Sequence, residues 1–331
     1  MMAVVVAAGS AVAGPVVTTV CQVSDPVLEE LSGLASDGTS WFAVNDSDDG
    51  AVRVQVLDRS CAVTRTITGG ADPYDVEDLA LAPDGTLWLA DIGDNQRRRP
   101  TVALHALAPD GGSRLYRFTY PDGAHDAEAL LLDAAGTPYV VTKEAIGSPL
   151  VYRPVSAPVE DGTVALEQVA KLSVGGTDTP GGPIKSAVVT RVVTGGAMSR
   201  DGRVAAVRTY TDAYLYPVPD GDLVKALKGD PVRIPLADEK QGEALAFEPD
   251  GSLLSAGEFG DGGTSSPVRS VSGAEALALP APPTTTTTPP PAAAPTSTTP
   301  EGGSAPIWPV LAGGVAVLGL VALLVRRTRR R

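Results

Sequence analysis

Cysteine, histidine and aromatic residues are scarce in this chain of 331 residues. It contains two cysteines, two histidines and 5% aromatic residues, whereas glycine (36) and proline (29) are abundant. Because neither cysteine has a histidine or a second cysteine at ligand spacing, the sequence argues against a zinc site. No Gly-X-Ser-X-Gly motif, dinucleotide-binding fingerprint or phosphate-binding loop occurs, which argues against an α/β-hydrolase, a Rossmann enzyme and a P-loop protein. The many turn formers favour a fold rich in strands over a helical one.

Basic residues are few outside the C-terminal end. The formal net charge is −13, and five of the 26 lysines and arginines lie within residues 326–331. The rest of the chain therefore carries 21 basic and 39 acidic residues. Such a surface repels nucleic acid and suits cations or basic partners. The alternative is a solvated acidic surface on an extracellular protein.

Long apolar runs are confined to the two ends of the chain. Residues 307–325 are 19 uncharged, largely apolar residues, which predicts a transmembrane helix. The arginine-rich residues 326–331 then form a cytoplasmic tail, which places the domain before the span outside the plasma membrane. Residues 1–13 resemble a secretory signal without a basic start. The Pro/Thr-rich residues 280–306 predict an extended stalk.

The two cysteines, Cys21 and Cys61, both precede residue 62. In an oxidising compartment two such cysteines usually pair, so we expect a disulfide. It would close a loop of about 40 residues and stabilise the fold by roughly 3 to 4 kcal/mol in the chain-entropy model.

Five copies of a strand–turn–strand pattern recur along residues 14–279. Each has a leucine or its equivalent at the same place (residues 34, 79, 130, 196 and 245), so the spacings are 45, 51, 66 and 49. Apolar residues alternate within each copy, and Asp-Gly pairs such as Asp84-Gly85 fit tight hairpins. Such periods predict a five- or six-bladed β-propeller. Six blades are favoured because the interval of 66 could hold a degenerate copy around 151–174, and tandem β-sandwiches are the alternative.

The two ends of the propeller segment are expected to meet. The N-terminal stretch VVTTVCQV and the later stretch PVRSVSGAEALAL have strand character and could close the ring together. Closure of this kind removes free sheet edges.

Acidic residues open the first strand of several copies. Glu77, Glu128 and Glu243 each lie two residues before the leucine position, so they should converge at one mouth of the channel. Three carboxylates near one axis repel unless a positive charge neutralises them. Either a Ca²⁺ ion does so, or basic residues form structural ion pairs with them. The second strands end at the same mouth and bring rim residues there: Asn45, Asp91, Lys143, Glu144, Arg208 and Glu258.

One histidine lies beside this acidic pattern. His125 precedes Asp126 and Glu128 in the segment GAHDAEA, which makes it the best candidate for a general base. A solvated loop histidine is the alternative interpretation.

The segment DVEDLALAPDGTLWLADIGDN (75–95) resembles the blade signature of the six-bladed TolB-like propellers, which include gluconolactonase-like enzymes. The resemblance covers roughly residues 16–279. It implies that acidic residues opening first strands, here Glu77, Glu128 and Glu243, are ligands of a central divalent metal. Asn45 and Asp91 would be the accompanying ligands, and Ca²⁺ is the cofactor expected. The whole layout also resembles surface proteins of high-GC Gram-positive bacteria.

Three functions fit these features. A stalk and an anchor favour a displayed binding or scaffold module that recognises an extracellular protein, a peptide or a wall polymer. The alternative is a metal-dependent hydrolase of a lactone, an ester or a phosphate ester at the acidic mouth, where Lys143 and Arg208 hold an anionic substrate. The third is a structural envelope protein.

Overall fold

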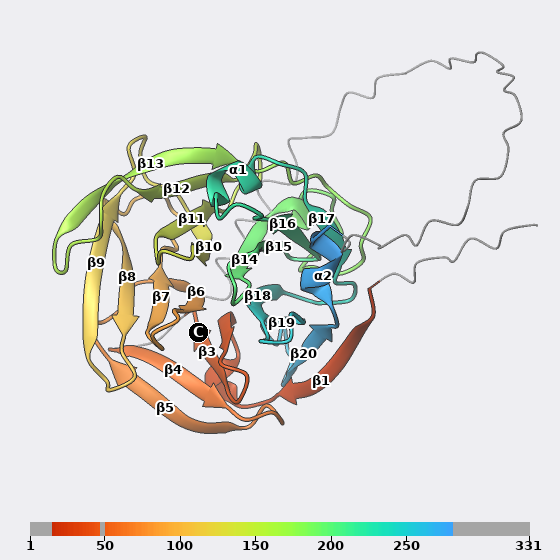
Figure 1. Ribbon diagram of the computed structural model, residues 1–331. Coiled ribbons are helices and arrows are strands. Elements are labelled where there is room, and N and C mark those ends of the chain that lie inside the picture. The colour runs from red at the N-terminus through yellow and green to blue at the C-terminus, as the bar shows by residue number, and fades with distance from the viewer. Residues whose placement is uncertain (1–14, 47–49, 281–331) are drawn as a thin grey trace, which may run out of the picture. The chain divides into compact units, whose positions relative to one another are not determined.

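The computed structural model of the chain describes residues 15–46 and 50–280 (Figure 1). The chain divides into two compact units, Met1–Pro282 and Pro283–Arg331, and every described residue lies in the first. The predicted signal segment, stalk (apart from Pro280), membrane span and cytoplasmic tail lie outside the described residues. Within the described ranges, no helix is both long and apolar enough to cross a membrane.

Antiparallel meanders of four strands make up the fold. The first contains β2 (Leu31–Ser36), β3 (Trp41–Asn45), β4 (Val52–Leu57) and β5 (Val63–Gly69). The second contains β6 (Val76–Leu81), β7 (Leu87–Asp91), β8 (Val102–Leu107) and β9 (Ser113–Thr119). The third contains β10 (Ala127–Leu132), β11 (Pro138–Thr142), β12 (Leu150–Pro154) and β13 (Thr163–Lys171). The fourth contains β14 (Val193–Met198), β15 (Val204–Thr209), β16 (Asp212–Pro217) and β17 (Val232–Pro235).

The last meander combines the two ends of the domain. Strands β18 (Gly242–Phe247), β19 (Leu253–Gly257) and β20 (Ser266–Val271) are completed by β1 (Val17–Val23), which pairs antiparallel with β20. The predicted meeting of the two terminal stretches is therefore confirmed. The predicted disulfide is also present, with an S–S distance of 2.04 Å between Cys21 on β1 and Cys61 in the β4–β5 turn. It ties the outer strand of the last meander to the first.

The meanders surround a common centre. Figure 1 shows β6, β10, β14 and β18 innermost, with β5, β9, β13 and β1 towards the rim. Each inner strand packs against the next, from β2 to β6, β10, β14, β18 and back to β2. The prediction of an all-β, propeller-type fold is confirmed at this level. The interval around 151–174 holds most of β12 and all of β13, the outer strands of the third meander, and β13 also pairs parallel with β9 of the second.

Within residues 15–46 and 50–280, helical structure is limited to short connections. These are two 3₁₀ turns, η1 (Pro26–Leu28) and η2 (Val189–Arg191), and two single-turn helices, α1 (Leu223–Leu227) and α2 (Ala274–Ala278). The long connection between β13 and β14 contains η2, and α1 lies between β16 and β17.

The inner strands approach each other closely because their facing residues are small. A Cβ on Gly33 would lie 2.6 Å from the backbone nitrogen of Leu79, so only glycine allows β2 and β6 to pack at this distance. Asp78, on β6, is fully buried and accepts hydrogen bonds from the backbone N–H groups of Leu130 (2.8 Å) and Gly196 (3.0 Å). This carboxylate links three inner strands, because Leu130 lies on β10 and Gly196 on β14.

Candidate metal centre

Every inner strand carries a register irregularity at its second residue. The five equivalent residues, each lying between the two residues where the register shifts, are Ser32, Glu77, Glu128, Thr194 and Glu243. A bulge of this kind leaves one residue unpaired and re-aims its side chain. Three of the five are glutamates, as the repeat predicted, and all three are buried.

Two neighbouring meanders bring three carboxylates together. Oxygen atoms of Glu77, Asp126 and Glu128 lie within 4.8 Å of one another, and each residue is at most 6% exposed. Gly93 forms one wall of this group, which we call the axial cluster. A Cβ at Gly93 would collide with Glu77 Oε1 and with the Asp75 carboxylate. The cluster therefore needs a residue without a side chain at position 93.

Burial and mutual repulsion raise the pKa values of these carboxyls. Burial is the largest cause for Glu77, whose pKa is well above its usual value, and the charges of Glu128 and Asp75 raise it further. For Glu128, burial raises the pKa to about 7 even though Lys143 opposes the shift. Burial also raises the pKa of Asp126. Each of these shifts favours the neutral carboxyl, so a further positive charge at the cluster would stabilise the ionised form.

A single ammonium group faces the axial cluster. Lys143 Nζ lies 2.6 Å from Glu128 Oε1 and 5.7 Å from the centre of the Tyr210 ring. Lys143 follows β11, and its backbone nitrogen donates to the carbonyl of Asp126 (2.9 Å). Burial alone would lower the pKa of Lys143, but Glu128 and further acidic groups outweigh it and raise that pKa well above the usual value.

Backbone contacts fix the orientation of Asp126. The N–H of Asp94 donates to Asp126 Oδ1 at 2.8 Å, and Asp94 Oδ2 in turn accepts from the N–H groups of Arg98 and Arg99, both at 2.7 Å. The arginine-rich loop after β7 thus supports one member of the axial cluster from outside.

Glu243 and Glu258 extend the acidic region towards the last meander. Burial, followed by the charge of Glu258, raises the pKa of Glu243 well above its usual value. Glu243 Oε2 is buried and has no hydrogen-bond partner among the described residues. Burial raises the pKa of Glu258 to about 7. A cavity of about 100 Å³ lies beside Glu258 and is also lined by Gln241 and Phe259.

Two predicted metal ligands, Asn45 and Asp91, accept hydrogen bonds from backbone N–H groups. Asn45 Oδ1 accepts a hydrogen bond from the N–H of Glu30 at 2.8 Å. Asp91 accepts from the N–H of Asp75 at 3.0 Å, and its carboxylate lies 2.8 Å from Arg99 and 3.3 Å from His105. Neither belongs to the axial cluster.

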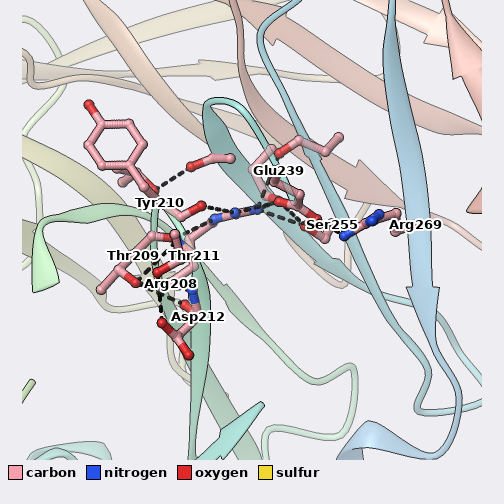
Figure 2. A network of polar contacts seen from close by, with 12 residues as sticks. Arg208, Thr209, Tyr210, Thr211, Asp212, Glu239, Ser255 and Arg269 are labelled. Carbon is pink, nitrogen blue, oxygen red and sulfur yellow. Dashed lines mark hydrogen bonds and ion pairs between the residues drawn. The ribbon is translucent and has the colours of Figure 1, made fainter. Parts of the chain in front are cut away.

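Arg208, predicted at the rim, is completely buried between two meanders (Figure 2). Its guanidinium donates to Glu239 Oε2 at 2.7 Å, to Ser255 Oγ at 2.8 Å and to the carbonyl of Ala244 at 3.0 Å. Figure 2 also shows Arg269 on the other side of Glu239, at 3.7 Å. With its donors engaged in this way, Arg208 joins β15 to the last meander.

His125 and Glu144 form a separate group beside the axial cluster. His125 Nε2 lies 3.1 Å from Asp122 Oδ1 and 3.0 Å from the Tyr152 hydroxyl, and Nδ1 lies 3.8 Å from Glu144 Oε1. Glu144 is also paired with Arg97 at 2.8 Å. His125 is thus held through Nε2, whereas its buried Nδ1 has no hydrogen-bond partner among the described residues.

Asp126 and Asp75 belong to the site although neither was among its predicted ligands. The signal was a repeated Asp-X-Glu spacing, in Asp75-Val76-Glu77 and Asp126-Ala127-Glu128. Asp75 and Asp126 directly precede β6 and β10, and the glutamate two residues later lies at the register shift of that strand, so each pair brings two carboxyls to the start of an inner strand. The first copy contains the equivalent Ser32, two residues before Leu34, and its hydroxyl donates to the carbonyl of Val76 at 2.9 Å.

No family model and no curated protein matches the chain. Solved structures similar to it include a gluconolactonase from Xanthomonas campestris, with 14% identity, a TM-score of 0.43, and coverage of 78% of this chain and 90% of that one. A PQQ-bound aldose sugar dehydrogenase from Streptomyces coelicolor has 13% identity and a TM-score of 0.40, covering 78% and 98%. A streptogramin B lyase has 10% identity and a TM-score of 0.39, covering 78% and 98%.

These structural neighbours are gluconolactonase-like and related β-propeller proteins, in agreement with the fold-level resemblance of the sequence. Because the three TM-scores are below 0.5, no activity is inferred for this chain from these structures.

Proposed function

We propose that this chain is a β-propeller that binds one divalent cation, of the calcium type, at the axial cluster and acts as a binding module. The observation that carries the proposal is the group of three buried carboxylates, Glu77, Asp126 and Glu128, whose oxygens lie within 4.8 Å of one another. Hard cations such as Ca²⁺ take oxygen ligands at 2.3–2.6 Å, about half of that separation.

The balance of charge supports a cation. Lys143 is the one basic side chain in the described ranges that pairs with the cluster, and it pairs with Glu128. The guanidinium of Arg208, on β15, is paired instead with Glu239, in the loop before β18. Glu77 and Asp126 have no basic partner of this kind in the described part of the chain. Carboxylates kept apart from water in this way are either protonated or bound to a cation.

The burial of the cluster favours a bound ion over an organic substrate. All three carboxyl residues are at most 6% exposed, and the cavity beside Glu258 measures only about 100 Å³. Typical small-molecule sites are three or more times larger, at about 300–1,000 Å³. In this proposal the main role of the cation is structural, because it crosslinks the second and third meanders through their carboxylates.

The finer architecture follows from the strand order. We infer five blades, because the eight-stranded sheet consists of two meanders joined by a short parallel pairing of β9 and β13 and one isolated bridge, Tyr116 to Glu160. In this arrangement β1 closes the ring as the outer strand of the fifth blade. The disulfide between Cys21 and Cys61 supports an oxidising, extracellular location. The predicted stalk and anchor would display the domain to an extracellular protein, peptide or wall polymer.

One observation favours a second candidate, a metal-dependent hydrolase of a lactone, an ester or a phosphate ester. The pKa of Glu128, raised to about 7 by burial, suits a group that donates and accepts protons near neutral pH. A cation in the cluster would activate water and polarise the scissile bond. This function also requires that the mouth admit a substrate.

Thermal unfolding of the purified full chain tests the cation site. We expect added Ca²⁺ to raise Tm relative to EDTA, because a site of micromolar affinity contributes about 4 kcal/mol at millimolar ligand. Glu77→Gln should remove most of this rise. The matched control is Asp220→Asn, an exposed carboxylate paired with Lys225, and it should keep the rise. Equal Tm values in Ca²⁺ and EDTA would contradict the proposal.

A further inference from the structure

The axial cluster already contains a positive charge from the protein itself. Lys143 Nζ contacts Glu128 Oε1 at 2.6 Å, and Glu128 is one of the three carboxylates that a bound cation would need. The Lys143 side chain is 17% exposed, and Glu128 is 3% exposed. A divalent cation and an ammonium group repel each other at such distances, so they cannot share this carboxylate without cost.

A second buried oxygen is available near the same ammonium group. Glu243 lies on β18, at the position equivalent to Glu128 on β10, and is 5% exposed. Its Oε2 has no hydrogen-bond partner among the described residues. The charges of Lys143, Glu128 and Glu243 act on one another, and all three act on the buried hydroxyl of Tyr210. Of these groups, the ammonium group lies near the Tyr210 ring, 5.7 Å from its centre.

We propose that Lys143 is a displaceable internal counter-ion, which moves from Glu128 to Glu243 when a divalent cation binds at the axial cluster. This inference rests on the proposed function, because it concerns the regulation of the same site. The cation takes the Glu128 carboxylate together with Glu77 and Asp126. The ammonium group then takes Glu243 Oε2, which has no partner before.

The properties of lysine fit this movement. Its ammonium group is a point charge on a flexible four-carbon stem, so it can exchange one carboxylate for another without rearranging the backbone. An unpaired buried charge is strongly destabilising, so a displaced ammonium group requires a new partner. The Tyr210 ring, 5.7 Å from Nζ, offers the ammonium group a cation–π contact.

The consequence is a lowered affinity for the cation. A divalent ion must displace an ion pair before it binds, so part of its binding free energy is used for that exchange. The site then responds to cation concentrations higher than the same three carboxylates would require alone. Lys143 raises the cation concentration required, because it competes for Glu128. Glu243 lowers that concentration, because it accepts the displaced ammonium group.

Calorimetric titration of the full chain with Ca²⁺ at pH 7.5 tests the exchange in a double-mutant cycle. We expect Lys143→Met to tighten Kd about tenfold and Glu243→Gln to weaken it about tenfold, equivalent to about 1.4 kcal/mol each. In the Lys143→Met background, Glu243→Gln should not change Kd further, because no ammonium group remains to move to Glu243. Lys225→Met, which changes an exposed lysine, is the matched control and should leave Kd unchanged. If Lys143→Met does not fold, Lys143→Gln replaces it.

Other outcomes would overturn the inference in distinguishable ways. Equal or weaker binding by Lys143→Met would show that Lys143 does not compete, while the cation site of the proposed function would stand. If Glu243→Gln weakened binding equally with and without Lys143, Glu243 would be a direct ligand. If neither the wild-type chain nor any variant bound Ca²⁺, both the exchange and the cation site would be refuted.

Discussion

The stability of the cation-free protein should fall as the pH rises from about 4.5 to 7. Burial raises the pKa of Glu128 from 4.5 to about 7 in the folded state. Below pH 4.5 the carboxyl is protonated in both states and folding carries no penalty. Between 4.5 and 7 only the unfolded state releases the proton, so the free energy of unfolding decreases, and above 7 the loss is complete.

The size of the effect follows from the same values. Each pH unit corresponds to 1.36 kcal/mol, so Glu128 alone accounts for a loss of about 3 kcal/mol between pH 4.5 and 7. Glu258, also raised to about 7 by burial, adds a loss of the same sign. Carboxyls whose pKa values lie below the usual range, such as Asp84 and Asp250, lose their contribution only at lower pH and fall outside this window.

Urea unfolding in EDTA at pH 5 and pH 7.5 measures this loss. Glu128→Gln cannot release a proton, so the difference in unfolding free energy between the two pH values should shrink by about 3 kcal/mol relative to the wild type. Asp220→Asn, the exposed control, should retain the wild-type difference. Added Ca²⁺ should compensate the loss at pH 7.5 but not at pH 5. An unchanged pH dependence in Glu128→Gln would refute the reasoning.

Three further variants test other parts of the account. Gly93→Ala should abolish the Ca²⁺-dependent rise in Tm because its Cβ would collide with two carboxylates, whereas Gly175→Ala, with nothing within 4 Å, should retain the rise. Replacing Cys21 and Cys61 by serine should lower the free energy of unfolding by roughly 3 to 4 kcal/mol in a urea titration, and added reductant should then have no further effect. Arg208→Met should cost about 3–5 kcal/mol, because it removes the buried partner of Glu239 at 2.7 Å and leaves the longer contact with Arg269 at 3.7 Å, while the Ca²⁺ response persists. A stable Arg208→Met variant that lost the Ca²⁺ response would assign the arginine to the site.

The fold was largely predictable because its determinants are local. Alternating residues and turns that contain glycine, most of them Asp-Gly, specify the inner hairpins, and the position of Glu77, Glu128 and Glu243 is the same in three copies. The interval of 66 residues was harder to interpret. Its extra length lies mostly in the connection between Lys171 and Val193, which has no strand pattern of its own.

The site was only partly predictable because side-chain directions depend on tertiary contacts. The sequence places Arg208 at the end of a second strand, but its burial arises from Glu239, a residue of the loop before β18. Likewise, Asp91 lies at the end of β7, where the backbone of Asp75 and the side chain of Arg99 engage it. Asp126 was within reach of sequence reasoning, because the Asp-X-Glu spacing recurs at the start of two inner strands.

A crystal structure of the full chain grown with Ca²⁺ tests the central claim most directly. The account predicts one ion bound by Glu77, Asp126 and Glu128 at 2.3–2.6 Å, with the ammonium group of Lys143 moved to Glu243. An axial cluster without an ion at millimolar Ca²⁺, with Lys143 still on Glu128, would contradict it.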